Sequence, residues 1–166
     1  MIVDDGRRAQ LSTVTLLVCD VDGTLTDGAM WFGADGEVLK RFHTRDGHGI
    51  GMARAAGIEV AVVTAEDSPI VLARAHKLGL SHVIVGCGDK AAAVRELRGV
   101  LGVQREAVAF IGDDLGDLPG FAESGVRVAV GDAVAEVRAA ADLVCMQPGG
   151  AGAVREFIDE LLASRA

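Results

Sequence analysis

Six short, continuous apolar runs alternate along this chain with six stretches of helical composition. The apolar runs are 14–19, 57–63, 81–85, 107–111, 126–130 and 143–145, and the helical stretches are 47–56, 69–78, 90–101, 115–123, 133–140 and 151–164. Continuous apolar character is typical of parallel strands that are covered on both faces. The alternation of strands and helices predicts an α/β fold, a Rossmann-like doubly wound parallel sheet with right-handed crossovers.

One segment interrupts this alternation. Residues 29–43 contain Asp35 followed by Gly36 between two short runs of partly alternating residues, which is the pattern of a β-hairpin. We therefore expect a small hairpin flap at about residues 28–43. The segment between Asp20 and Thr64 has room for this flap and one helix, so no large cap domain is expected. Without a linker or a repeat in the sequence, residues 1–166 are predicted to form a single domain.

Three local signals define the ends of predicted helices. Ser68, directly before Pro69, predicts an N-cap followed by proline at the first helical position. Gly79 predicts the end of the same helix, because glycine readily adopts the left-handed conformation that closes a helix. Asp89 is expected to cap the helix that begins at Lys90.

Charge and composition exclude several classes of function. The chain has 16 Lys and Arg against 24 Asp and Glu, a net charge of −8, whereas binding to nucleic acid requires a basic surface. No apolar run approaches the roughly 18 residues that span a membrane, and the first ten residues contain no apolar leader. The three cysteines form no CxxC pair, so neither a disulfide framework nor a zinc site is expected. A cytoplasmic location is the expectation.

Polar side chains follow the expected strands at the points where four of them end. They are Asp20, Asp22, Thr64, Lys90, Asp113, Asp114 and Asp117. Because ligands of open α/β sheets bind at the carboxyl ends of the strands, we expect these side chains at one edge of the sheet. Carboxylates crowded at one edge repel each other unless a cation or protons intervene. Hard oxygen ligands of this kind suit Mg²⁺, which also binds substrate phosphate, so the pattern predicts Mg²⁺-dependent phosphoryl chemistry.

The Asp-x-Asp pair divides this chemistry into two roles. Asp20 is expected to attack phosphorus in line and to form an aspartyl phosphate. Asp22 is expected to protonate the leaving alkoxide and later to deprotonate the attacking water. Thr64 and Lys90 are expected to hold the phosphoryl oxygens, because phosphoryl transfer depends mainly on alignment and charge neutralisation.

From about residue 14 to residue 160, these motifs occur in the order and at the strand ends typical of the haloacid dehalogenase superfamily of phosphatases. The resemblance implies the same roles, with Asp20 as the nucleophile and Asp22 as the general acid and base. It also implies that Mg²⁺ is held by Asp20, the backbone carbonyl of Asp22, and Asp113. Asp114 and Asp117 are implied to lie nearby.

Further motifs resemble those of the 3-deoxy-D-manno-octulosonate 8-phosphate phosphatase family. They are Leu25-Thr26-Asp27-Gly28, Thr44-Arg45-Asp46-Gly47, Asp89-Lys90, Asp113-Asp114-Leu115 and the segment 149–156. Members of that family have a similar length and a hairpin in place of a cap domain. They are tetramers in which hairpins and the C-terminal tail of a neighbour close the site. The resemblance thus implies a homotetramer that takes a small sugar phosphate.

Two departures bear on the substrate and the metal. The octulosonate enzymes usually have Thr-Gly-Arg after the second strand, whereas Glu66 takes the place of the arginine here. Glu66, with Arg74 and Lys77 on the next helix, is similar to the 2-keto-3-deoxy-nonulosonate 9-phosphate phosphatases of the same branch. That similarity implies that Arg74 and Lys77 hold the sugar carboxylate, and Arg45 is a further expected substrate contact. The second departure is Gly116, where the family more often has Asn.

The sequence therefore predicts a Mg²⁺-dependent phosphatase that removes the terminal phosphate of an acidic 3-deoxy-ulosonate. Glu66 favours a nonulosonate 9-phosphate, and 3-deoxy-D-manno-octulosonate 8-phosphate is the alternative substrate. A non-catalytic regulatory companion of a nucleotide-sugar synthesis enzyme is a further alternative, against which the intact Asp20 and Asp22 argue. A phosphorylated receiver domain is disfavoured because its acceptor follows a later strand. Mutases of the superfamily usually need a larger cap, and its dehalogenases lack the second aspartate.

Overall fold

The six apolar runs form one parallel sheet, as predicted. The strands are β1 (Leu16–Cys19), β4 (Glu59–Val63), β5 (His82–Ile84), β6 (Val108–Gly112), β7 (Val126–Ala129) and β8 (Leu143–Val144), in the spatial order β5-β4-β1-β6-β7-β8. The structure is a computed structural model that describes residues 4–165. Residues 1–3 and residue 166 lie outside the described residues. The predicted domain 1–166 includes all four of them, and the N-terminus that is expected to lack a leader includes the first three.

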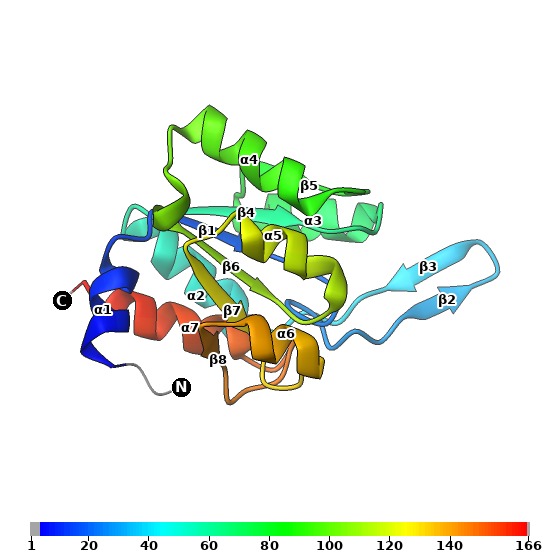
Figure 1. Cartoon of the computed structure of the whole chain (residues 1–166). Helices are drawn as coiled ribbons and strands as arrows, with labels where there is room; N and C mark the ends of the chain where they lie inside the picture. The colour runs from blue at the N-terminus through cyan, green and yellow to red at the C-terminus, as the bar shows by residue number, and fades with distance from the viewer. Residues whose placement is uncertain (1–3, 166) are drawn as a thin grey trace.

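Helices cover both faces of the sheet (Figure 1). They are α1 (Asp5–Ser12), α2 (Thr44–Ala55), α3 (Pro69–Leu78), α4 (Lys90–Leu101), α5 (Leu118–Ala122), α6 (Ala135–Ala140) and α7 (Ala153–Ala163). Helix α2 packs against α3 and α7, and α4 packs against α5. No helix within residues 4–165 is long and apolar enough to cross a membrane.

Two helices differ from the sequence prediction. The predicted helix 115–123 is a short 3₁₀ turn, Leu115–Asp117, followed by α5. Helix α1 was not predicted, because its sequence is mostly polar and only its C-terminal end is anchored by a fully buried residue, Leu11. Its N-terminus is capped by Asp4, whose carboxylate accepts the backbone N–H of Arg7 at 2.8 Å.

The register of the central strands brings their ends to one level. Cys19, the last residue of β1, pairs with Val62 of β4 on one side and with Ile111 of β6 on the other. All residues of β1 and β6 are buried, so a slip in register would misplace the closely packed apolar side chains on both faces of these strands. The loops that follow β1, β4 and β6 therefore begin side by side at the carboxyl edge of the sheet.

The segment between β1 and α2 forms the predicted hairpin. Strands β2 (Trp31–Gly33) and β3 (Gly36–Leu39) pair antiparallel. The turn residues are Ala34 and Asp35, one position before the predicted Asp35-Gly36 pair. Gly36 begins β3 with a φ of 119°, a conformation that side-chain-bearing residues rarely adopt.

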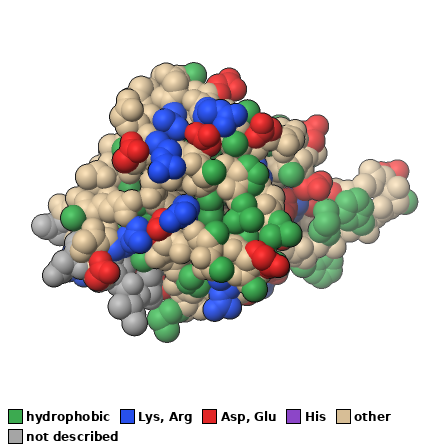
Figure 2. All heavy atoms as spheres, in the orientation of Figure 1, with side chains coloured by type: hydrophobic (Ala, Val, Ile, Leu, Met, Phe, Trp, Pro, Cys, Tyr) green, Lys and Arg blue, Asp and Glu red, His purple; other side chains and the backbone are tan. Residues whose placement is uncertain are grey.

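This hairpin projects from the body of the molecule and exposes apolar side chains (Figures 1 and 2). Trp31 is 54% exposed and Phe32 is 63% exposed. Met30, Val38 and Leu39 on the same hairpin are also exposed. Exposed apolar side chains gathered on one projecting element are typical of a site of association.

Two of the three predicted helix-end signals are confirmed. Gly79 ends α3 in the left-handed conformation, and the carboxylate of Asp89 caps α4 by accepting the backbone N–H of Ala92 at 3.0 Å. The third prediction is wrong in one respect, since Ser68 occupies the N-cap position without a capping hydrogen bond. Its hydroxyl instead donates to Glu37 of the hairpin at 2.6 Å, because β3 lies close enough to compete for it.

Phe110 lies in the middle of β6, is completely buried and packs edge-on against Phe121 of α5, with 5.8 Å between ring centroids. Replacement Phe110→Ala should lower the free energy of unfolding by about 3–5 kcal/mol, because it leaves a cavity between the sheet and α5. Urea denaturation measures this change. The exposed Val100 provides the control, since Val100→Ala should change stability by less than about 0.5 kcal/mol; equal effects would contradict this packing.

Candidate active site

The loops at the carboxyl edge of the sheet enclose a cavity of about 640 Å³. Its lining residues are Asp20, Asp22, Thr64, Ala65, Glu66, Cys87, Gly88, Asp89, Lys90, Asp113, Asp114, Gly116, Asp117 and Pro119. All seven residues that the strand-end pattern singled out are among them. The structure therefore brings together side chains from four loops that are far apart in the sequence.

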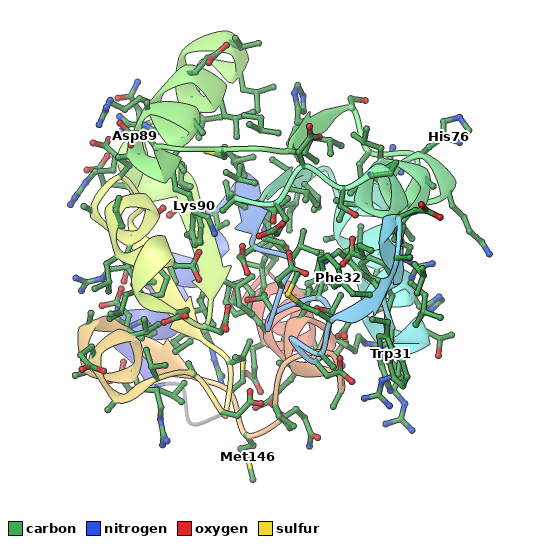
Figure 3. All side chains as sticks on the ribbon, turned by 90° about the vertical axis from the view of Figure 1, so that its right-hand side faces the viewer. Trp31, Phe32, His76, Asp89, Lys90 and Met146 are labelled. Atoms are coloured by element: carbon green, nitrogen blue, oxygen red, sulfur yellow. The ribbon has the colours of Figure 1, made fainter. Side chains whose placement is uncertain are left out.

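Lys90 connects two of these loops. It is the first residue of α4. Figure 3 views the molecule from the end that carries the hairpin and shows the side chain of Lys90 pointing toward the centre of this end. Its ammonium donates to Asp20 at 2.5 Å and to Asp117 at 2.6 Å, and its side chain is only 9% exposed. Burial alone lowers the pKa of Lys90, but the adjacent Asp20 and Asp117 carboxylates raise it overall, so the ammonium stays charged.

Asp20, Asp113 and Asp117 form a carboxylate cluster. One oxygen of each lies within 4.8 Å of the others. Burial, together with the nearby Asp117, raises the pKa of Asp20 well above its usual range and that of Asp113 to about 6. Two contacts lower these pKa values in part: Lys90 acts on Asp20, and a 3.2 Å hydrogen bond that the Thr24 hydroxyl donates acts on Asp113. Three clustered carboxylates, of which only Asp20 and Asp117 are paired with the ammonium of Lys90, have the donor chemistry and the spacing to hold a divalent cation.

Asp117 belongs to this cluster, whereas Asp114 lies outside it. Asp117 is buried, and its second oxygen accepts the backbone N–H groups of Asp113 at 2.8 Å and Asp114 at 3.2 Å. Asp114 is exposed and caps the following 3₁₀ turn by accepting the N–H of Leu115 at 2.7 Å. Of the two residues that the resemblance implies lie near the metal, Asp117 is thus the one within the carboxylate cluster. Gly116 is exposed, with open space where a side chain would extend.

Glycines allow the loops to approach this closely. Gly23 has a φ of 90°, and a Cβ at this position would collide with the carboxylate of Asp113. Gly149, in the loop before α7, packs against the backbone of Gly23 just as tightly. A side chain at Gly23 would push the loop after β1 away from the loop after β6, and a side chain at Gly149 would push it away from the loop before α7.

Asp22 lies outside the carboxylate cluster and is held at both of its oxygens. Lys40 donates to Oδ1 at 2.5 Å, and the hydroxyl of Thr64 donates to Oδ2 at 3.3 Å. The sequence analysis missed Lys40. The one available signal was its position within the predicted flap segment, which gave no reason to expect its side chain to turn back into the body.

The residues expected to contact the sugar are not gathered in one place. Glu66 is exposed and lines the cavity, as expected of a substrate contact. Arg74 lies over the ring of Phe42 at 5.5 Å, and Lys77 is exposed on α3; neither lines the cavity within this chain. Arg45 borders a separate hollow of about 550 Å³ beside α7.

Known proteins resemble this chain in both fold and sequence. The haloacid dehalogenase-like hydrolase family matches residues 87–158. The 3-deoxy-D-manno-octulosonate 8-phosphate phosphatase KdsC of Yersinia pestis is 42% identical over 98% of this chain and 87% of its own length.

Two solved structures support the match. The cobalt-bound octulosonate 8-phosphate phosphatase of Haemophilus influenzae has a TM-score of 0.92 and 43% identity over 94% of this chain and 91% of its own. The Moraxella catarrhalis enzyme, in complex with magnesium ion, phosphate ion and a KDO molecule, has a TM-score of 0.92 and 35% identity over 98% of this chain and 94% of its own.

The fold, the strand-end motifs and these matches define a haloacid dehalogenase-like hydrolase. Within that class the chain belongs to the family of 3-deoxy-D-manno-octulosonate 8-phosphate phosphatases. It is a phosphoric monoester hydrolase, as the sequence predicted, and divalent metal is bound in structures of its relatives. The predicted preference for a nonulosonate 9-phosphate is not supported by these matches, which favour the alternative substrate.

Asp113→Asn removes one of three mutually repelling carboxylates. The folded-state pKa of Asp113, about 6, lies above its ordinary value of 3.8, so its ionisation costs stability as the pH rises through this interval. In chelator-treated protein near neutral pH, the variant should be more stable than the wild type by about 1–2 kcal/mol, and the difference should vanish in acid. Urea unfolding at several pH values measures it.

The same variant should also lose most of the thermal stabilisation that Mg²⁺ gives the wild type. Glu136→Gln, a matched change at an exposed position on α6, should leave both the pH dependence and the Mg²⁺ effect intact. If Asp113→Asn responds to Mg²⁺ as the wild type does, Asp113 does not hold the cation.

Proposed function

We propose that this chain removes the 8-phosphate from 3-deoxy-D-manno-octulosonate 8-phosphate through an aspartyl-phosphate intermediate on Asp20. One observation carries the proposal: a buried Asp20, bonded to Lys90, lies in a carboxylate cluster in a chain that resembles KdsC over nearly its whole length. The cavity around Asp20 is large enough for a phosphorylated sugar acid.

In the first half of the reaction, an oxygen of Asp20 forms a bond to phosphorus while the bond from phosphorus to the sugar oxygen breaks. Asp22 gives its proton to that oxygen, so the sugar leaves as an alcohol. In the second half, water attacks phosphorus, its proton passes to Asp22, and the bond between Asp20 and phosphorus breaks. Inorganic phosphate leaves, and both carboxyl groups return to their starting states.

We propose that Mg²⁺ is bound by Asp20, Asp113 and the backbone carbonyl of Asp22, with Asp117 and Asp114 beside it. A bound Mg²⁺ would neutralise the charge that otherwise keeps an anionic nucleophile from an anionic phosphate. Thr64 and Lys90 line the cavity and are the proposed ligands of the phosphoryl oxygens.

A nonulosonate 9-phosphate is the second candidate substrate, and the position of Glu66 in the cavity wall favours it. Arginine usually occupies this position in the octulosonate enzymes, so the reversed charge alters the site where the sugar binds. Arg45, Arg74 and Lys77 remain proposed substrate contacts, although they lie outside the cavity of their own chain. A panel of substrates decides between the two sugars.

We propose that the working form is a homotetramer associated through the hairpins. Two observations support this: the hairpin exposes several apolar side chains, and Lys90 is already paired with two carboxylates, although among residues 4–165 it is the one basic residue that lines the cavity. A sugar carboxylate would thus need a cation from a second copy.

A cytoplasmic location is also proposed, since Cys19, Cys87 and Cys145 are all free thiols.

Phosphate release from a panel of sugar phosphates tests the proposed activity. With Mg²⁺, the wild type should prefer octulosonate 8-phosphate to nonulosonate 9-phosphate, N-acetylneuraminate 9-phosphate and hexose phosphates. Asp20→Asn should lower kcat for every substrate by roughly a thousandfold or more, because no covalent intermediate forms. Glu136→Gln on α6 serves as the matched control with unchanged rates. A wild type that released no phosphate from any ester would disprove the proposal, and a preference for nonulosonate 9-phosphate would establish the second candidate.

Replacing Trp31 and Phe32 together by Asp tests the proposed assembly. The double variant should elute as a monomer in size-exclusion chromatography with light scattering, since charged groups cannot be buried between hairpins. Its kcat/KM for octulosonate 8-phosphate should fall roughly tenfold or more as closure of the site is lost. Val100→Asp, an equally exposed apolar position far from the hairpin, is the control; a monomeric wild type would refute the assembly.

A further inference from the structure

Lys40 is a charged residue that neither the sequence motifs nor the proposed reaction uses. It follows β3 directly, at the base of the hairpin, and its side chain is only 1% exposed. The ammonium donates to Asp22 at 2.5 Å and forms an ion pair with Glu37 at 2.6 Å. A buried ammonium is costly unless it is paired, and Lys40 is paired with two carboxylates.

The contact continues beyond Lys40. The second oxygen of Glu37 accepts the hydroxyl of Ser68 at 2.6 Å, and Ser68 immediately precedes α3. A continuous line of polar contacts thus runs from the loop after β1, through the hairpin, to the start of α3. The hydrogen bond from Ser68 to Glu37 explains why the Ser68 side chain does not cap α3.

The geometry separates Lys40 from a substrate ligand. Asp22 faces the cavity, with a side chain that is 27% exposed, whereas Lys40 does not line the cavity. The ammonium therefore lies behind Asp22, on the side away from the space where phosphate would bind. Replacing such a buried ion pair by apolar groups often costs little stability, so the need to build a fold does not account for it.

We propose that Lys40 is a positioning residue for Asp22, so that the hairpin supplies part of the acid–base apparatus. The proposal rests on the proposed function, in which Asp22 gives a proton to the sugar oxygen and takes one from water. Lys40 holds one carboxylate oxygen and Thr64 the other, which limits rotation of Asp22 and keeps it directed at the reacting oxygens. Glu37 in turn holds Lys40, and Ser68 holds Glu37.

The two halves of the reaction separate this role from a general structural one. p-Nitrophenolate leaves without a proton, so transfer of the phosphoryl group from p-nitrophenyl phosphate to Asp20 does not need Asp22. Hydrolysis of the aspartyl phosphate still needs Asp22 as a base. An alkyl phosphate needs Asp22 in both halves, because an alkoxide is a poor leaving group.

Rapid-mixing kinetics with Lys40→Met, Lys40→Arg and Arg41→Met test the proposal. With p-nitrophenyl phosphate, Lys40→Met should keep a burst of p-nitrophenol at the wild-type rate while its steady-state rate falls, so the ratio of burst to steady-state rate rises. Its kcat for an alkyl phosphate should fall roughly 10- to 100-fold with little change in KM. Lys40→Arg should recover part of this loss. Arg41→Met, at an exposed neighbour on the same hairpin segment, should behave as the wild type.

Two results would overturn the proposal in folded protein: wild-type rates for Lys40→Met on both substrates, or loss of the burst together with the steady state. If Lys40→Met does not fold, Glu37→Gln replaces it, since this variant keeps Lys40 but weakens its anchor. A raised burst-to-steady-state ratio in Glu37→Gln supports the proposal, and unchanged rates or a lost burst refute it. Failure of the wild type to hydrolyse either ester would instead refute the proposed function.

Discussion

Carboxylates crowded at the carboxyl edge of a buried sheet are the physical constraint around which this molecule is organised. Asp20, Asp113 and Asp117 lie within a few ångströms of one another, and the ammonium of Lys90 pairs with Asp20 and Asp117. Burial and mutual repulsion make the arrangement costly, as the raised pKa values of Asp20 and Asp113 show. A site with this excess of negative charge is suited to a divalent cation and, through it, to a phosphate ester.

The scaffold serves to hold that arrangement in place. Three central strands end at one level because their apolar residues fix the register, and glycine at positions 23 and 149 lets the loops close together. The hairpin also helps to hold the site, although it lies outside the main sheet. Its outer part exposes apolar side chains, while its base sends Lys40 back to Asp22. One short insertion thus offers a surface for association and a contact to the proposed acid and base.

Much of the fold was accessible from sequence because its signals are local. Continuous apolar runs marked every strand of the main sheet, and Gly79 and Asp89 marked helix ends. Helix α1 was not predicted from the sequence because its composition is polar and its stability comes from packing of its C-terminal end. Ser68 was assigned to its own helix because no local pattern shows that a hairpin carboxylate competes for its hydroxyl.

The same division holds for the site. The sequence by itself determined the fold class, the superfamily and the residues that meet at the strand ends. Parallel strands end at one edge of the sheet, and the two-residue spacing of Asp20 and Asp22 places both carboxylates directly after the first strand. Only the tertiary structure decided that Lys40 holds Asp22, that Asp117 rather than Asp114 joins the carboxylate cluster, and that Arg74 lies over Phe42 outside the cavity. These contacts join segments far apart in the chain, and long side chains reach partners that no periodicity or spacing encodes.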